Sequence, residues 1–138
     1  MDNIHYNFVD VEIPDFNPEF FSLWLSKVIK SYDKLIGPLS FVFCSDEYLL
    51  DMNIKYLNHD YYTDIITFDY REGDTISGDL LISVDRVVEN AGDLQVDWRN
   101  ELNRVVVHGV LHIIGYKDKS ELDEKVMREK EDFYLGFT

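Results

Sequence analysis

The stretch that decides the fold of this chain is ELNRVVVHGVLHIIGYKDKS, residues 101–120. Residues 105–114 are apolar almost all round, a pattern that predicts a buried helix. His108 and His112 are four positions apart, so on a helix they lie about 40° apart around the axis and roughly 6 Å along it. Both imidazoles can bind one metal ion from these positions, and the stretch therefore predicts a metal site on a buried helix.

The third ligand is predicted just beyond the end of this helix. Gly115 is a helix-stop signal, and the turn at residues 116–117 can return the Asp118 carboxylate toward the two histidines. Two nitrogen ligands, one oxygen ligand and an open position for water describe a catalytic zinc site, with one ion per chain. The negative end of the helix dipole lies nearby and favours a cation.

Two other interpretations of the histidines remain open. A buried histidine is often a hydrogen-bonded core residue, although two at ligand spacing on one face would each need a separate partner. A zincin peptidase has the motif H-E-x-x-H, but Gly109 stands where the glutamate base would be, which disfavours a peptidase. Glycine inside a helix costs about 1 kcal/mol relative to alanine, so we expect a substrate or a tightly packed neighbour beside Gly109.

Segments of alternating apolar and polar residues, or of β-branched residues, come early in the chain, and long helical patterns come late. Four strands are predicted, at residues 4–8, 39–43, 64–68 and 80–84, with a turn at residues 71–74. This distribution predicts an α/β (α+β) fold, a small four-stranded mixed sheet packed with helices, with the metal site at the end of a buried helix. Residues 1–138 are expected to form a single domain, because 138 residues are too few for two independent cores.

Helix boundaries are predicted from residues that cap or stop helices. The signals are Asn17-Pro18 at the start and Gly37-Pro38 at the end of the first helix, then Ser45, Asp85, Asp97, and Ser120 with Asp123 as N-terminal caps of the later ones. The longest predicted helix runs over residues 98–114 and contains both histidines.

Composition excludes several classes of protein. With 46% hydrophobic and 29% charged residues, the chain is not intrinsically disordered. A net charge of −14 opposes indiscriminate binding to DNA or to an anionic membrane. Residues 95–138 carry 7 Lys/Arg against 9 Asp/Glu, so this nearly neutral third is where an anionic partner is expected to bind.

The expected compartment is the cytoplasm. Cys44 is the single cysteine, which excludes an internal disulfide and fits a reducing environment. The N-terminal residues lack the basic and apolar regions of a signal peptide, and no run reaches the roughly 18 apolar residues of a membrane span.

Three segments resemble one known family. HGVLHIIGYKD, residues 108–118, resembles the H-G-x-L-H-x-x-G-Y-x-H signature of the YbeY family of metal-dependent endoribonucleases. MNIKYLNHDYYTDIITF, residues 52–68, is similar to the family's L-N-x-x-Y-R-x-x-D-x-P-T-D-V-L-S-F segment, and GDLLIS, residues 78–83, to its G-D-I-x-I-S strand. The segments appear in family order and together span about residues 45–120.

The resemblance implies a zinc-dependent endoribonuclease specific for single strands. It implies a role in ribosomal RNA maturation, at the 3′ end of 16S rRNA, and in ribosome quality control. The implied partners are ribosomal RNA and the small ribosomal subunit, and a basic ribosomal protein is a further candidate because the chain is acidic. Hydrolysis of the phosphodiester would use the ion to acidify its bound water and to polarise a phosphoryl oxygen. The general base is unassigned, because no glutamate follows His108 and Asp118 is a ligand.

Two departures from the family pattern bear on chemistry. The family's third zinc histidine corresponds to Asp118, which keeps a ligand but adds negative charge and weakens the Lewis acidity of the ion. The family's arginine, implied to serve catalysis on RNA, corresponds to Leu57, which can neither bind phosphate nor stabilise a pentacovalent transition state. Lys55 or His59 could supply the missing charge, although each can equally be a solvated surface residue.

Other candidate residues have two interpretations each. Arg104, Lys117, Lys119 and Arg128 are candidates for binding RNA phosphates, or are ion-pair partners of Glu101, Glu121 and Glu124 on helix surfaces. Thr63 and Asp64 stand at the family's T-D pair. They either start the strand at residues 64–68 or orient a ligand histidine by a hydrogen bond.

Two alternatives to the enzyme also remain. One is a non-catalytic, metal-stabilised protein that associates with the ribosome, which Leu57 favours. The other is an acidic interaction domain without a metal.

Overall fold

A four-stranded mixed sheet organises the chain, as the sequence predicts. The computed structural model describes residues 3–137. The elements are β1 (Ile4–Val9), α1 (Pro18–Lys30), β2 (Leu35–Cys44), α2 (Asp46–Leu57), β3 (Ile65–Asp69), β4 (Thr75–Ser83), α3 (Val84–Leu94), α4 (Trp98–Ile114) and α5 (Glu121–Leu135). The strand order is β1-β2-β4-β3, in which β1-β2 and β2-β4 are parallel and β3-β4 is antiparallel. β3 is therefore an edge strand.

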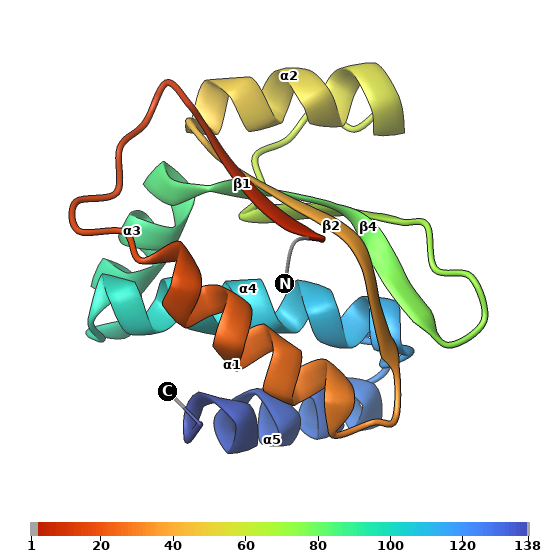
Figure 1. Cartoon of the computed structure of the whole chain (residues 1–138). Coiled ribbons are helices and arrows are strands. Elements are labelled where there is room, and N and C mark those ends of the chain that lie inside the picture. The colour runs from red at the N-terminus through yellow and green to blue at the C-terminus, as the bar shows by residue number, and fades with distance from the viewer. Residues whose placement is uncertain (1–2, 138) are drawn as a thin grey trace.

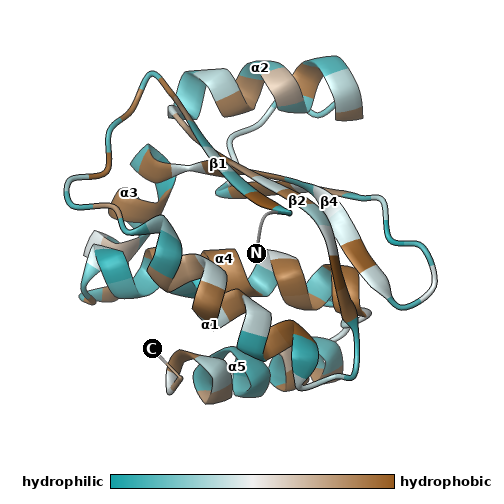
Figure 2. Cartoon of the chain, in the orientation of Figure 1, coloured by the Kyte–Doolittle hydropathy of each residue, from teal (hydrophilic) through white to brown (hydrophobic). Residues whose placement is uncertain are grey.

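Helices cover the two faces of the sheet unequally. Figure 1 shows α2 on one face and α1, α3, α4 and α5 on the other, with α5 in a second layer beyond α4. The larger core lies on the α4 face and includes Phe41, Leu80, Val106 and Leu111, all fully buried. Hydrophobic residues follow the strands and α4, whereas α5 is mostly hydrophilic (Figure 2). α4 is thus held between the sheet and an outer helix.

Most of the predicted caps are confirmed. The side chain of Asn17 accepts a hydrogen bond from the backbone N–H of Phe20, with Pro18 as the first helical residue. Asp97 caps α4 and Ser120 caps α5 in the same way, and Ser45 caps α2. Side-chain oxygens thereby satisfy N–H groups that have no partner in the first helical turn.

The predicted end of the first helix is wrong. α1 ends at Lys30, and Gly37-Pro38 lies inside β2. The register between β2 and β4 shifts between Ile36 and Leu39, and this irregularity accommodates a proline that cannot donate to the ladder. The sequence signal marked a bulge in a strand and not a helix stop.

The predicted cap of α3 is also wrong. Ser83, the last residue of β4, accepts a hydrogen bond from the backbone N–H of Arg86 and caps the helix. The Asp85 carboxylate accepts instead from the backbone N–H of Asp46, at the start of α2, with a distance of 2.9 Å. A tertiary contact thus outcompetes the local cap.

Gly109 is explained by tight packing of α4 on the sheet. A Cβ at this position would lie 2.8 Å from Cδ1 of Ile65 on β3 and closer still to the Leu80 side chain on β4. The absence of a side chain therefore lets α4 approach β3 and β4 closely, which places the next turn of α4 beside the edge strand. Within residues 3–137, no helix is long and apolar enough to cross a membrane.

Candidate metal centre

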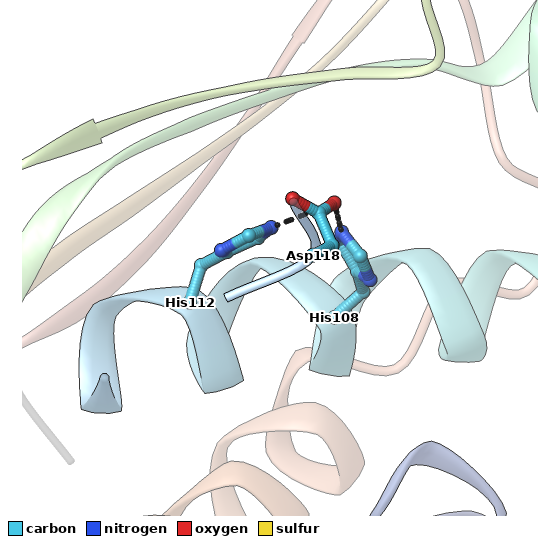
Figure 3. A group of neighbouring side chains, drawn as sticks. All are labelled: His108, His112 and Asp118. Atoms are coloured by element: carbon cyan, nitrogen blue, oxygen red, sulfur yellow. Dashed lines mark hydrogen bonds and ion pairs between the residues drawn. The ribbon is translucent and has the colours of Figure 1, made fainter. Parts of the chain in front are cut away.

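The three predicted ligands lie together at the C-terminal end of α4. One ligand atom each from His108, His112 and Asp118 lie within 4.8 Å of one another. The Asp118 Oδ2 atom lies 3.6 Å from Nε2 of His108 and 3.3 Å from Nε2 of His112. Figure 3 shows both rings rising from one side of α4 with the Asp118 carboxylate between them. The group is therefore arranged to hold one cation.

The turn after α4 explains how Asp118 reaches the histidines. Gly115 has φ 134°, a conformation that side-chain-bearing residues rarely adopt, and the N–H of Tyr116 donates to the carbonyl of Leu111. Arg71, from the turn before β4, donates to the last carbonyl groups of the helix, those of Ile113 and Ile114. The chain consequently leaves α4 in a fixed direction and returns over the histidines.

The second nitrogen of each histidine has its own hydrogen-bond partner. Nδ1 of His112 lies 3.0 Å from the carbonyl oxygen of Tyr116, and Nδ1 of His108 lies 2.8 Å from Oε2 of Glu131. A carbonyl only accepts, so in the neutral His112 ring Nδ1 carries the proton and the Nε2 lone pair faces Asp118. With both rings neutral, two lone pairs and a carboxylate face one another, and this donor set fits a divalent cation.

Glu131 was missed in the sequence, although it left a signal there. It is 5% exposed and belongs to α5, on the same buried face as Met127 and Tyr134. A glutamate at a core position of an amphipathic helix needs a partner inside the protein. Its partners are His108 and Arg104, whose Nη1 lies 2.9 Å from Oε1.

The electrostatics of His108 and Glu131 are reciprocal. Burial by itself lowers the pKa of His108, but the hydrogen bond and negative charge of Glu131 raise it above the usual value. Burial raises the pKa of Glu131, but His108 and Arg104 hold it below the usual value. Glu131 is therefore an ionised acceptor for the Nδ1–H group of His108.

Two cavities meet at His108, His112 and Asp118, which together are called the metal group below because they could hold a metal ion. One, of about 490 Å³, lies between α4 and α5, and the other, of about 440 Å³, lies between α4 and β3. Asp64, Ile65, His108 and Asp118 line both cavities. An extended ligand can therefore occupy space on both sides of the three ligands.

Comparison with known proteins identifies the family of the chain. The profile of the family described as endoribonuclease YbeY matches residues 10–137. This chain belongs to the YbeY family. The endoribonuclease YbeY of Flavobacterium johnsoniae is 50% identical over 129 residues, which cover 94% of this chain and 92% of that protein. The endoribonuclease YbeY of Parabacteroides distasonis is 46% identical over 133 residues, covering 96% and 94%.

A solved structure supports the fold. The solution structure of TM1509 from Thermotoga maritima matches with a TM-score of 0.71 and 24% sequence identity, over 94% of this chain and 86% of that chain. The fold predicted from the sequence, a small four-stranded mixed sheet packed with helices, is therefore confirmed.

The candidate charge substitutes for the family arginine lie away from His108, His112 and Asp118. Lys55 and Leu57 belong to α2, on the opposite face of the sheet from α4 (Figure 1). His59 follows α2, and its Nδ1 atom lies 3.0 Å from the hydroxyl oxygen of Tyr61. Among the described residues, none of these three lines either cavity beside the metal group. The structure therefore does not bring Lys55 or His59 to the metal ligands.

The candidate RNA-binding residues are placed differently from one another. Arg104 pairs with Glu131 at 2.9 Å and with Asp132 at 2.6 Å, so its guanidinium is mostly engaged inside the protein. Lys117 and Lys119 flank Asp118 and are exposed. Lys117 and Lys119 therefore place positive charge next to the candidate ligands, and Arg128 lines the cavity between α4 and α5.

Thr63 and Asp64 do not orient the histidines in the part of the chain that the structure describes. Glu131 and the Tyr116 carbonyl occupy that role. The Asp64 carbonyl accepts from the N–H of Ser83 in β4, which fits the structural interpretation, while its side chain lines both cavities. Burial raises the pKa of the Asp64 carboxyl, and the charge of His108 lowers it in part.

Proposed function

We propose that this chain is a metal-dependent endoribonuclease that hydrolyses phosphodiester bonds of single-stranded RNA. Its role would be ribosomal RNA maturation, at the 3′ end of 16S rRNA, and ribosome quality control. Membership of the YbeY family supports the reaction class. The observation that carries the proposal is the group of His108, His112 and Asp118 at the junction of two cavities.

The proposed ion is zinc, held by these three side chains. When bound, it would supply Lewis acidity to a phosphoryl oxygen and make a bound water more acidic. His108 is held by Glu131 and His112 by the Tyr116 carbonyl, so neither ring has to reorient. Lys117 and Lys119 are the proposed phosphate contacts, with Arg104 contributing positive charge from behind His108.

Asp118 distinguishes this site from a three-histidine site. A carboxylate lowers the net charge of the loaded group from +2 to about +1, so a bound water should be less acidic. Carboxylate ligands also suit harder ions such as manganese. We therefore propose slower hydrolysis near neutral pH and a broader choice of metal than three histidines would give.

The proposed partner is RNA within the small ribosomal subunit. A net charge of −14 opposes tight capture of a free polyanion, because phosphate contacts to cationic side chains dominate such binding. A basic ribosomal protein could recruit this acidic chain to its substrate in the cytoplasm. Co-sedimentation with ribosomal particles at low salt is the expected result, and independent sedimentation would contradict the partner.

Cleavage assays test the proposed reaction. Purified chain should cleave single-stranded RNA and leave structured RNA intact, and both a chelator and His108→Ala should abolish the cleavage. If the loaded chain bound RNA without cleaving it, it would be a metal-stabilised ribosome-associated protein and the proposed function would be wrong.

Variants at residue 118 test the third ligand. Asp118→Ala should weaken metal binding strongly, because only two ligands remain. Asp118→His should tighten zinc and shift the alkaline rise of the cleavage rate toward lower pH. Unaltered zinc affinity in Asp118→Ala would mean that another side chain is the third ligand.

A further inference from the structure

The cavity between α4 and α5 is lined by a few apolar and many charged side chains. Ile65, Val105 and Met127 form the apolar part of its lining. The charged part has twice as many carboxylates as cations: Asp64, Glu101, Asp118, Glu121, Glu124 and Glu131 against Arg104, Lys125 and Arg128. Its volume of about 490 Å³ lies within the range of roughly 300–1,000 Å³ for small-molecule sites. Apolar side chains beside polar groups suit a heterocyclic base, which combines an apolar face with a polar edge.

Glu101 is a carboxylate of this cavity that makes no hydrogen bond to the rest of the described protein. The residue is 8% exposed, and within residues 3–137 its carboxylate has no hydrogen bond. Its nearest cation is Arg104, whose Nε lies 3.9 Å from Oε1, too far for a hydrogen bond. Arg104 directs its other nitrogens to Glu131 and Asp132. The Glu101 side chain is 11% exposed and has only this distant ion pair, so its carboxylate oxygens are open to hydrogen-bond donors of a ligand in the cavity.

We propose that this cavity is a nucleobase subsite that takes guanine, with the Glu101 carboxylate accepting hydrogen bonds from the N1–H and N2–H groups of the base. The proposal rests on the proposed function, because it makes the guanine part of the RNA substrate. It adds a specificity-determining residue to the site.

The chemistry of the four bases selects guanine. Its N1–H and N2–H donors are adjacent and match the two oxygens of a carboxylate. Adenine and cytosine each place one amino donor beside an acceptor nitrogen, and that acceptor faces the second oxygen unfavourably. Uracil offers one donor between two carbonyl acceptors. A buried acceptor discriminates strongly against ligands that leave it unpaired.

The position of the cavity connects the base to the metal group. His108 and Asp118 line this cavity as well as the one beside β3. A nucleotide whose base occupies the α4–α5 cavity therefore has its phosphate next to the metal ligands. Lys125 and Arg128 are exposed on α5, and Arg128 is close enough to act on Glu101 by its charge. These two cations reduce the repulsion between the carboxylates of the lining and a phosphate.

Nucleotide binding to the metal-loaded full chain tests the subsite without requiring cleavage. Isothermal titration with 5′-GMP, 5′-IMP and 5′-UMP compares ligands that share the phosphate and differ at the base edge. We expect 5′-GMP to bind roughly tenfold more tightly than 5′-IMP, which lacks the N2 amine, and more tightly still than 5′-UMP. Equal binding of the three nucleotides, or no binding of 5′-GMP, would overturn the proposal.

Variants assign the preference to Glu101. Glu101→Gln should reduce the affinity for 5′-GMP to about that for 5′-IMP and leave 5′-UMP unchanged. Glu129→Gln, on the exposed surface of α5, is the matched control and should bind like the unchanged chain. A purely structural role for Glu101 would weaken all three nucleotides equally, which would contradict the subsite. The comparison of 5′-GMP with 5′-IMP uses the unchanged protein, so it holds even if Glu101→Gln does not fold.

Cleavage separates this proposal from the proposed function. RNA oligonucleotides that differ at a single guanine position should be cleaved at different rates by the unchanged chain and at similar rates by Glu101→Gln. Chelator-sensitive cleavage with no guanine preference would refute the subsite alone. Selective 5′-GMP binding without cleavage of any RNA would refute the proposed function and leave the subsite supported.

Discussion

One face of the sheet is covered by α4 and the other by α2, and the two faces differ in how many layers of helices pack over them. On the α4 face, a large buried core is backed by α5 in a second layer, and this layer supplies Glu131 to His108. On the α2 face, a small cluster of Cys44, Leu49, Ile66 and Leu81 is covered by a single helix. Side chains at a metal group have to be held in fixed positions, and only the deeper face has a helix behind the ligand-bearing one.

Removing both histidines should give the largest difference between the two faces, measured as the loss of metal affinity. His108→Ala/His112→Ala leaves one of the three ligands, and each ligand of a structural zinc site accounts for roughly 3 kcal/mol. The metal affinity should therefore fall by roughly 10,000-fold, measured by competition with a chromophoric chelator. Leu57→Ala, on the α2 face, is the control and should keep the metal. Equal retention by the double variant would show that the group is not the metal site.

Replacing one buried leucine on each face of the sheet compares how tightly the two faces are packed. Leu111 on α4 and Leu49 on α2 are both almost completely buried. Leu111→Ala should lower the free energy of unfolding by about 3–4 kcal/mol, and Leu49→Ala by about 2 kcal/mol, because the thinner layer can collapse around its cavity. Urea unfolding measures both. A larger loss for Leu49→Ala would reverse the assignment of the deeper core.

Replacing Glu131 tests the contribution of the second layer to the metal group. Glu131→Gln keeps the shape but removes the charge that holds the Nδ1–H group of His108. Loss of such an outer partner weakens metal binding by about 10–100-fold. The matched control is Glu129→Gln, two residues earlier and exposed. An unchanged metal affinity in Glu131→Gln would mean that α4 alone positions His108.

Cys44 lies on the α2 face, and ionisation of its thiol should have the smallest effect of those predicted. Burial, with the negative charges of Asp85 and Asp46, raises the pKa of its thiol to about 12. The unfolded chain loses this proton near pH 9 while the folded chain keeps it, so the free energy of unfolding should decrease as the pH rises above about 9. Cys44→Ala should remove this part of the pH dependence, measured by urea unfolding between pH 8 and pH 10.

The reaction of Cys44 with a thiol reagent gives the complementary measurement. At pH 8 the folded chain should react far more slowly than the unfolded chain, because the thiolate is the reactive form and the side chain is fully buried. If the folded chain reacted as fast as the unfolded one, the α2 face would open freely and would not be a stably packed layer.

Local signals in the sequence were sufficient for the elements that carry the ligands. Asp97 and Gly115 bound α4, and the spacing of His108 and His112 predicts their common side of the helix. Predictions from signals that depend on a neighbouring strand or helix are wrong. Gly37-Pro38 proved to be a bulge beside β4, and Asp85 binds the start of α2 and does not cap α3.

By itself, the sequence determined α4, its two ends, the histidine pair and the return of the chain at Asp118. Helical periodicity, capping and a glycine stop act within a few residues, so they can be read along the chain. Only the tertiary structure decided that Glu131 holds His108, that Arg104 pairs with Glu131, and that Glu101 faces a cavity without a hydrogen bond. These facts depend on how α5 packs against α4, and residues 20 or more positions apart meet through packing that no local pattern specifies.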